Sequence, residues 1–239
     1  MNIGTVVEGP SDRLVLKAVL DKLLPGEHRY FALQPPLTFG ETGTGWKGVR
    51  RWCQQTWQLD DSSLENILLS SVAVPLDLLV IQVDADIANE DDLQMDASEK
   101  PAIPDVEQPC PPVQATVNKL RQVIARWLDH NADTLPEQIL LAIPAQHTES
   151  WLFAALFPDD DLCQRDDYEC LKGGKDDPAF RLTLKRYGKH LSRRGKKISK
   201  PMRNYQKIAP QVAQQWNTVC KICSQARSFA EDVAARTTP

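Results

Sequence analysis

Hydrophobic positions follow two spacings along the first two-thirds of the chain, and these spacings predict strands and helices in turn. Short apolar, β-branched runs predict strands at residues 3–7, 30–33, 76–83 and 138–143. Apolar residues three and four positions apart predict helices at residues 12–24, 46–57, 114–130 and 148–157. Alternation of strands and helices favours an α/β fold with a parallel sheet flanked by helices. The run at 76–83 is nearly all apolar, as expected of a central strand.

After Pro158 the pattern changes, because the strands end and the chain becomes polar, basic and mainly helical. We therefore expect one domain over residues 1–157 and a basic helical C-terminal extension over residues 158–239. The last part, residues 209–235, is predicted as one or two helices that pack back on the core. Within the first domain, residues 88–112 are rich in acidic residues and proline, which predicts an irregular, exposed insertion.

Composition is ordinary for a soluble globular protein, with 239 residues, 42% of them hydrophobic and 25% charged. No apolar run approaches the roughly 20 residues of a membrane span, so we expect no membrane association. Residues 1–7 contain no basic segment and no cleavage site, which predicts no signal peptide and a cytoplasmic location. The tryptophans fall on apolar helical faces and are expected in the core: Trp46, Trp52, Trp57, Trp127, Trp151 and Trp216.

A cytoplasmic location predicts that the cysteines are reduced thiols, several of them buried. The chain has six: Cys53, Cys110, Cys163, Cys170, Cys220 and Cys223. The last two have CxxC spacing, but no second pair completes a zinc site.

Charge is segregated along the chain, although its net value is only −4. No acidic residue interrupts the basic stretch between Arg181 and Lys207. Such a stretch favours contact with nucleic-acid phosphates. The alternatives are a solvated helical face, or docking on the chain's own acidic insertion. The candidate nucleic-acid-binding residues are Lys185, Arg186, Lys189, Arg193, Arg194, Lys196 and Lys197.

Acidic residues follow the predicted strands at the points where each strand ends. They are Glu8, Asp12, Asp84, Asp86 and Glu149. Ligands of parallel α/β sheets bind at the carboxyl ends of the strands, so we expect these side chains to converge. Converging carboxylates repel one another unless their pKa values rise or a cation joins them. An all-oxygen site of this kind suits Mg²⁺ or Mn²⁺, as one ion or two.

Each of these acids also has a structural interpretation when it is taken alone. Glu8 fits a solvated turn, and Asp12 and Glu149 fit the first turns of helices, where the helix dipole favours negative charge. His147 lies beside Glu149, but a single histidine at a turn is more typical of a local hydrogen bond. We therefore leave His147 outside the predicted catalytic set.

Three motifs carry a resemblance to the Toprim family. The segment 8–12 (EGPSD), between a strand and a helix, resembles the first Toprim motif in its OLD-nuclease form, EGxxE, with Asp12 in the final acidic place. The segment 84–86 (DAD) resembles the Toprim DxD motif. The segment 143–152 (IPAQHTESWL) is similar to a later acidic motif of small standalone Toprim-like proteins. The resemblance covers roughly residues 1–157.

This resemblance implies a Toprim-like, Rossmann-like sheet that acts on phosphodiester bonds with a divalent metal. It makes Glu8 an acid/base group and a metal ligand, and assigns Asp84 and Asp86 to metal binding and catalysis, with Asp12 and Glu149 as further ligands. OLD-like enzymes also use a lysine at the scissile phosphate, for which Lys200 and Lys207 are the candidates. Small relatives are encoded beside an ATPase in bacterial anti-phage systems, so an ATPase partner is expected by analogy.

The sequence thus predicts a Mg²⁺- or Mn²⁺-dependent endonuclease acting on DNA or RNA, the effector of an anti-phage defence system. The alternative is a non-catalytic regulatory subunit of an ATPase complex that binds metal and nucleic acid. A third interpretation is a phosphotransfer enzyme for small molecules. The chain has no Walker motif of its own, since residues 40–45 lack the terminal Gly-Lys-Ser/Thr. Whether it works alone or as a homodimer stays open.

Overall fold

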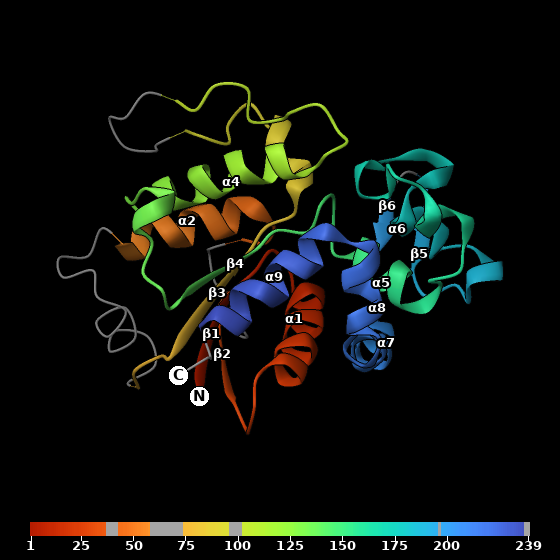
Figure 1. The fold of residues 1–239 in the computed structure, drawn as a ribbon, viewed down its shortest axis with the longest axis horizontal. Helices are drawn as coiled ribbons and strands as arrows, with labels where there is room; N and C mark the ends of the chain where they lie inside the picture. Colours follow the sequence, from red (N-terminus) through yellow and green to blue (C-terminus); the bar gives the residue numbers. More distant parts are fainter. Residues whose placement is uncertain (37–42, 58–73, 96–101, 196, 237–239) are drawn as a thin grey trace.

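The centre of the molecule is a four-stranded sheet in which all strands are parallel (Figure 1). The structure, a computed structural model, describes residues 1–36, 43–57, 74–95, 102–195 and 197–236. The strand order is β2-β1-β3-β4. The strands are β1 (Asn2–Val6), β2 (Arg29–Gln34), β3 (Leu78–Gln82) and β4 (Ile139–Ala142). The predicted α/β class with a helix-flanked parallel sheet is confirmed.

Alternate residues of the central strands face two separate apolar layers. In β3, Leu78 and Val80 belong to one hydrophobic cluster, and Leu79 and Ile81 belong to the other. This is the period of two that a strand imposes on its side chains. Both clusters are buried, which explains why the β3 sequence shows no polar alternation.

Helices cover both faces of the sheet (Figure 1). On one face lie α2 (Trp46–Trp57) and α4 (Gln114–Trp127). The cluster on the other face includes buried residues of α1 (Pro10–Leu23), α5 (Glu149–Leu156), α7 (Met202–Gln214), α8 (Trp216–Ile222) and α9 (Ser224–Ala235). The last three helices therefore share a core with α1, and the helical segment begins seven residues before the predicted start at Ala209. No helix within the described ranges is long and apolar enough to cross a membrane.

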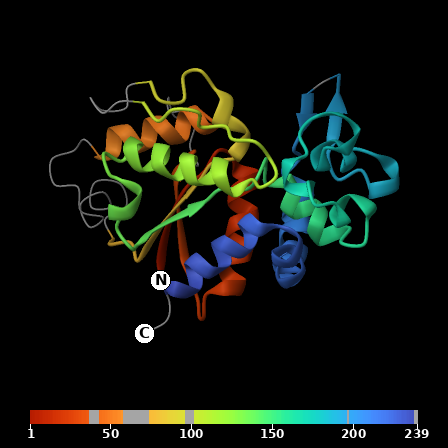
Figure 2. The ribbon, with the colours of Figure 1, turned by 45° about the horizontal axis from the view of Figure 1, so that its top comes forward.

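Residues 158–199 project beside the sheet and its helices (Figure 2). They contain the short helix α6 (Pro178–Arg181) and several single 3₁₀ turns, followed by an antiparallel hairpin of β5 (Ser192–Arg194) and β6 (Lys197–Ser199). The prediction that strands end at Pro158 is therefore wrong. Each hairpin strand has three residues, mostly basic or polar, so no apolar alternation marks them in the sequence.

The acidic insertion is irregular, as predicted, but it is not simply exposed. Leu93, Ile103 and Val106 are buried in the cluster that also contains α4. Residues 96–101 lie outside the described part of the chain. The prediction of an exposed segment is wrong for these three anchors, because isolated apolar residues between charged ones give no periodic signal.

Core packing of the tryptophans is confirmed at five of the six positions. Trp46, Trp52, Trp127, Trp151 and Trp216 are all at most 9% exposed. Trp57 ends α2, and its side chain lies outside the described ones.

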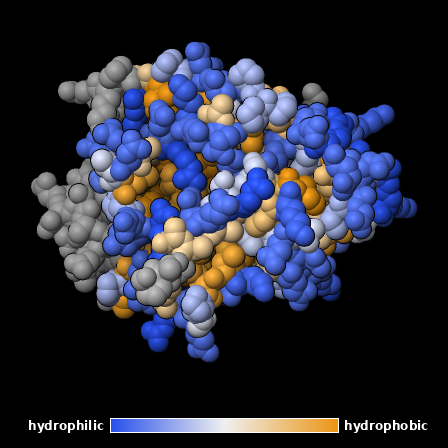
Figure 3. All heavy atoms as spheres, viewed as in Figure 1, coloured by the Kyte–Doolittle hydropathy of each residue, from blue (hydrophilic) through white to orange (hydrophobic). Residues whose placement is uncertain are grey.

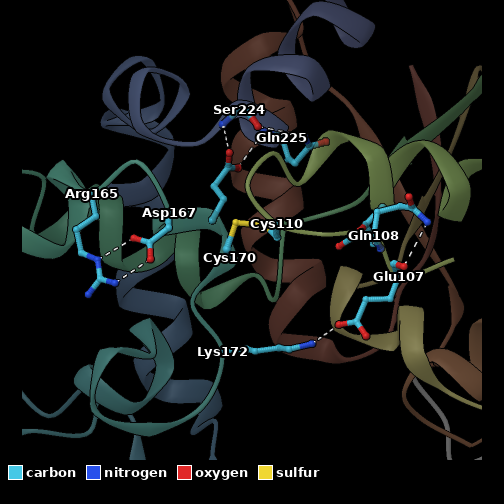
Figure 4. Close-up of a disulfide and its surroundings, with 11 residues drawn as sticks. Glu107, Gln108, Cys110, Arg165, Asp167, Cys170, Lys172, Ser224 and Gln225 are labelled. Atoms are coloured by element: carbon cyan, nitrogen blue, oxygen red, sulfur yellow. Dashed lines mark hydrogen bonds and ion pairs between the residues drawn. A yellow bond between two sulfur atoms is a disulfide. The ribbon is translucent and has the colours of Figure 1, made fainter. Parts of the chain in front are cut away.

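Two cysteines form a disulfide, which corrects the expectation of six reduced thiols (Figure 4). Cys110 of the insertion is bonded to Cys170, and Lys172 forms an ion pair with Glu107 beside it. Sixty residues separate the two cysteines, so sequence spacing does not indicate their pairing. The other four, Cys53, Cys163, Cys220 and Cys223, are free.

Candidate functional site

The two central strands deliver Glu8 and Asp84 to the same edge of the sheet. The backbone N–H of Asp84 donates a hydrogen bond to Oε1 of Glu8 at 2.7 Å. Gln82, the last residue of β3, supports both acids: its Oε1 accepts from the Glu8 N–H at 3.1 Å, and its Nε2 donates to Oδ1 of Asp84 at 2.8 Å. Because β1 and β3 are hydrogen-bonded neighbours, parallel pairing alone brings these strand ends together.

Asp12 reaches the same edge from the first turn of α1. Pro10 begins this helix, and Asp12 in its first turn is only 3% exposed. Its Oδ1 lies 4.0 Å from Nζ of Lys200 and accepts no hydrogen bond within the described part of the chain. A buried carboxylate oxygen without a donor is costly to maintain, so this atom is available to a cationic ligand.

Residues after position 158 supply the counter-charge of the site. Glu149, at the start of α5, is 1% exposed, and its Oε1 lies 2.7 Å from Nζ of Lys200. The hydroxyl of Tyr205, on α7, donates a hydrogen bond to the same oxygen. Lys200 lies between β6 and α7, so the hairpin and the helix fix its place at the sheet edge.

His147 bridges two carboxylates in the wall of the site. Its Nε2 lies 3.1 Å from Oδ1 of Asp177, and its Nδ1 lies 3.4 Å from Oε2 of Glu149. Although burial opposes the change, Asp177 and Glu149 raise the pKa of His147. Asp177 also caps α6 by accepting hydrogen bonds from the Ala179 and Phe180 N–H groups, which holds its carboxylate in place.

These groups surround one cavity of about 390 Å³, which we call the acidic cavity. Six of its lining residues carry the chemistry: Glu8, Asp84, Asp86, His147, Glu149 and Lys200. Asp12 is not among the lining residues but lies 4.0 Å from Lys200, and Asp86, in the 3₁₀ turn that follows β3, has an exposed side chain. The structure therefore brings together all five predicted acids and one of the two predicted lysines.

Acids outnumber cations around the acidic cavity, and the pKa values of these acids are shifted from their ordinary values. Burial, opposed by the hydrogen bond from the Asp84 N–H and aided by the charges of Asp12 and Asp86, raises the pKa of Glu8 to about 8. Burial and the charges of Glu8 and Asp12 raise the pKa of Asp84 well above its ordinary value. Glu149 differs: although burial opposes it, Lys200 and His147 lower its pKa.

The predicted basic residues lie on the surface of the region after position 158. Lys185, Arg186 and Lys189 are exposed around one 3₁₀ turn, and Arg193, Arg194 and Lys197 are exposed on the β5–β6 hairpin. Lys196 lies outside the described residues. This part of the surface is mainly hydrophilic (right side of Figure 3). Lys207 is exposed on α7 and does not line the acidic cavity.

Sequence reasoning missed Tyr205 and Asp177 and left out His147. An Asp-Pro pair at 177–178 is a recognisable helix-start signal, but it does not reveal that Asp177 faces His147. Tyr205 falls on the apolar face of a helix, where the sequence pattern predicts a core residue.

Comparisons with protein-family models, with curated proteins and with solved structures found no match to this chain.

Proposed function

We propose that this protein is a metal-dependent nuclease that hydrolyses phosphodiester bonds in DNA or RNA, with a Toprim-like site. One observation carries the proposal: four of the five carboxylates line a single cavity, and the fifth, that of Asp12, lies 4.0 Å from Lys200, the counter-charge in the cavity wall. Acids with a purely structural role are rarely buried so close together, because the negative charge of each carboxylate raises the pKa of its neighbours. Functional sites are where such costs are maintained.

The donor set fits a hard divalent cation. Carboxylate oxygens are the preferred ligands of Mg²⁺ and Mn²⁺, and Oδ1 of Asp12 is a buried oxygen without a hydrogen-bond donor in the described structure. Within the described ranges, no group of three or more His, Cys, Asp or Glu side chains is already arranged so that it could hold a metal ion. The residues that would hold the ion are Glu8, Asp12, Asp84, Asp86 and Glu149. When bound, the ion supplies Lewis-acid stabilisation to the phosphoryl group.

The chain's own groups would have distinct tasks in this reaction. Glu8, held against the Asp84 N–H, is placed for proton transfer at the cavity wall. Lys200 stays protonated because, although burial opposes it, Glu149 and Asp12 raise its pKa, so its ammonium can meet phosphate charge. Tyr205 and His147 hold Glu149 from two sides. The exposed cations of the hairpin would contact the nucleic-acid backbone.

The test is cleavage of supercoiled plasmid, single-stranded DNA and structured RNA with Mg²⁺, with Mn²⁺ or with EDTA. Asp84→Asn is the inactivating variant, and Asp133→Asn, an exposed acid outside the site, is its matched control. We expect metal-dependent cutting by the wild type and by Asp133→Asn, and none by Asp84→Asn. Cutting that survives in Asp84→Asn would contradict the proposal. A folded wild type that cuts nothing would favour the non-catalytic binding subunit instead.

A further inference from the structure

A second hollow adjoins the acidic cavity on the side of the β5–β6 hairpin. It has a volume of about 550 Å³. Asp177 and Ile198 line both hollows, so the second begins where the acidic cavity ends. We call it the hairpin groove, and its other main lining residues are Gly173, Lys175, Phe180 and Arg193.

The groove combines an apolar floor with a cationic rim. Phe180 and Ile198 are half-buried and give the floor, whereas Lys175 and Arg193 are exposed at the edge. The guanidinium carbon of Arg193 lies 4.7 Å from the centre of the Phe180 ring. An aromatic ring and a guanidinium are both flat groups on which a nucleobase can stack.

A glycine turn fixes one wall of the groove. Gly173 has φ +69°, a conformation that other residues adopt only with strain. Its N–H donates to Oδ2 of Asp177 at 2.9 Å, while Oδ1 of the same carboxylate faces His147. Asp177 therefore couples the position of this turn to the wall of the acidic cavity.

We propose that the hairpin groove binds an unpaired nucleobase and its phosphate, next to the phosphodiester that enters the acidic cavity. The inference rests on the proposed function and names its substrate class as single-stranded nucleic acid. Base faces are available to Phe180 only where a strand is unpaired, since a duplex hides them in its stack. The cationic rim suits the phosphate that follows the base, and the strand then continues past Ile198 to the acids.

The test measures binding without cleavage, by fluorescence anisotropy in EDTA. The probes are a fluorescein-labelled 12-nucleotide strand of DNA, the same strand of RNA, and the 12-base-pair duplex. Phe180→Leu keeps an apolar side chain but removes the ring face. Arg193→Gln removes the positive charge beside the Phe180 ring. Lys221→Gln, an exposed cation of α8 that lines neither hollow, is the control. Thermal unfolding confirms that each variant is folded.

We expect the wild type to bind the single strands more tightly than the duplex. Phe180→Leu should weaken single-strand binding about tenfold, the size of one lost base–aromatic stack, and leave duplex binding unchanged. Arg193→Gln should weaken it and lower the slope of log affinity against log salt by about 1. The two single-stranded probes show whether the groove prefers DNA or RNA.

Equal affinity of the wild type and Phe180→Leu for single strands would overturn the inference, as would a preference for the duplex. The assay contains no metal, so its outcome is independent of the nuclease test. If Phe180→Leu loses single-strand binding while the wild type cuts no substrate, the nuclease proposal is refuted and the base-binding role of the hairpin groove is retained. If the wild type cuts its substrate but Phe180→Leu binds single strands as tightly as the wild type, the nuclease proposal is retained and the base-binding role of the groove is refuted.

Discussion

Nζ of Lys200 lies 2.7 Å from Oε1 of Glu149, and this contact joins the acids at the sheet edge to the segment that follows the hairpin. Glu149 is positioned by the helix after β4, whereas Lys200 follows the hairpin about fifty residues later in the chain. The contact places a cation among acids that would otherwise face one another alone.

Replacing Lys200 with methionine should therefore destabilise the protein and abolish cleavage. The change leaves Glu149 and Asp12 without their nearest cation, and we expect the free energy of unfolding to fall by about 2 kcal/mol, less than for a fully buried pair because Lys200 is partly exposed. Urea unfolding measures this. Lys207→Met, at an exposed position on the following helix, should change stability by less than about 0.5 kcal/mol. Equal effects of the two variants would contradict the role of Lys200.

The stability of the metal-free protein should fall as the pH rises. The pKa of Glu8 goes from an ordinary 4.5 to about 8 in the folded protein, so the folded state holds a proton that the unfolded chain has released. Between these two values the folded state binds more protons, and the free energy of unfolding decreases with pH. Urea unfolding in EDTA at pH 5, 6, 7 and 8 tests this, and Glu8→Gln should flatten the dependence.

Divalent metal should oppose that trend, because a cation replaces the protons among the acids. Mn²⁺ should raise the melting temperature more at pH 8 than at pH 5.5. A stabilisation that is equal at both values, or one that persists in Asp84→Asn, would place the metal elsewhere in the protein.

Tyr205 should act on the metal affinity of the site rather than on the fold. Tyr205→Phe removes only the hydroxyl that donates to Glu149, and partners of metal ligands typically contribute tenfold to a hundredfold in affinity. We expect calorimetric titration with Mn²⁺ to show at least a tenfold weaker affinity. Tyr30→Phe, which loses a hydroxyl bonded to Asp21 at the surface, is the matched control and should bind Mn²⁺ as the wild type does.

Thiol counting should reveal the disulfide. The unfolded, non-reduced protein should expose four reactive thiols, and all six after reduction. Cys110→Ser should lower the free energy of unfolding by about 2–4 kcal/mol, since the bond closes a long loop of the unfolded chain. Cys220→Ser changes a half-buried free cysteine and should cost less. Six reactive thiols before reduction would refute the bond.

The sheet and the five acids could be predicted because their signals are local. Apolar runs mark the strands, and parallel topology places Glu8 and Asp84 at one edge without any knowledge of side-chain contacts. The counter-charges were harder to predict, because Lys200 is one of many cations in a basic stretch and only the packing of α7 against α1 singles it out.

The sequence pattern contains no signal for contacts between distant segments. Asp177 meets His147 across thirty residues, and Cys110 meets Cys170 across sixty. The basic hairpin is equally hidden, because its strands are too short and too polar to show a period.

The late position of Lys200 and Tyr205 also sets the order in which the site can be assembled during synthesis. A ribosome releases the sheet and all five acids before either residue has been made. Chains generally begin to fold from the N-terminus as they emerge, so a nascent chain holds its acids at the sheet edge without their counter-charge. The cavity is complete only after Lys200 and α7 leave the exit tunnel, so the site forms later than the sheet that carries its acids.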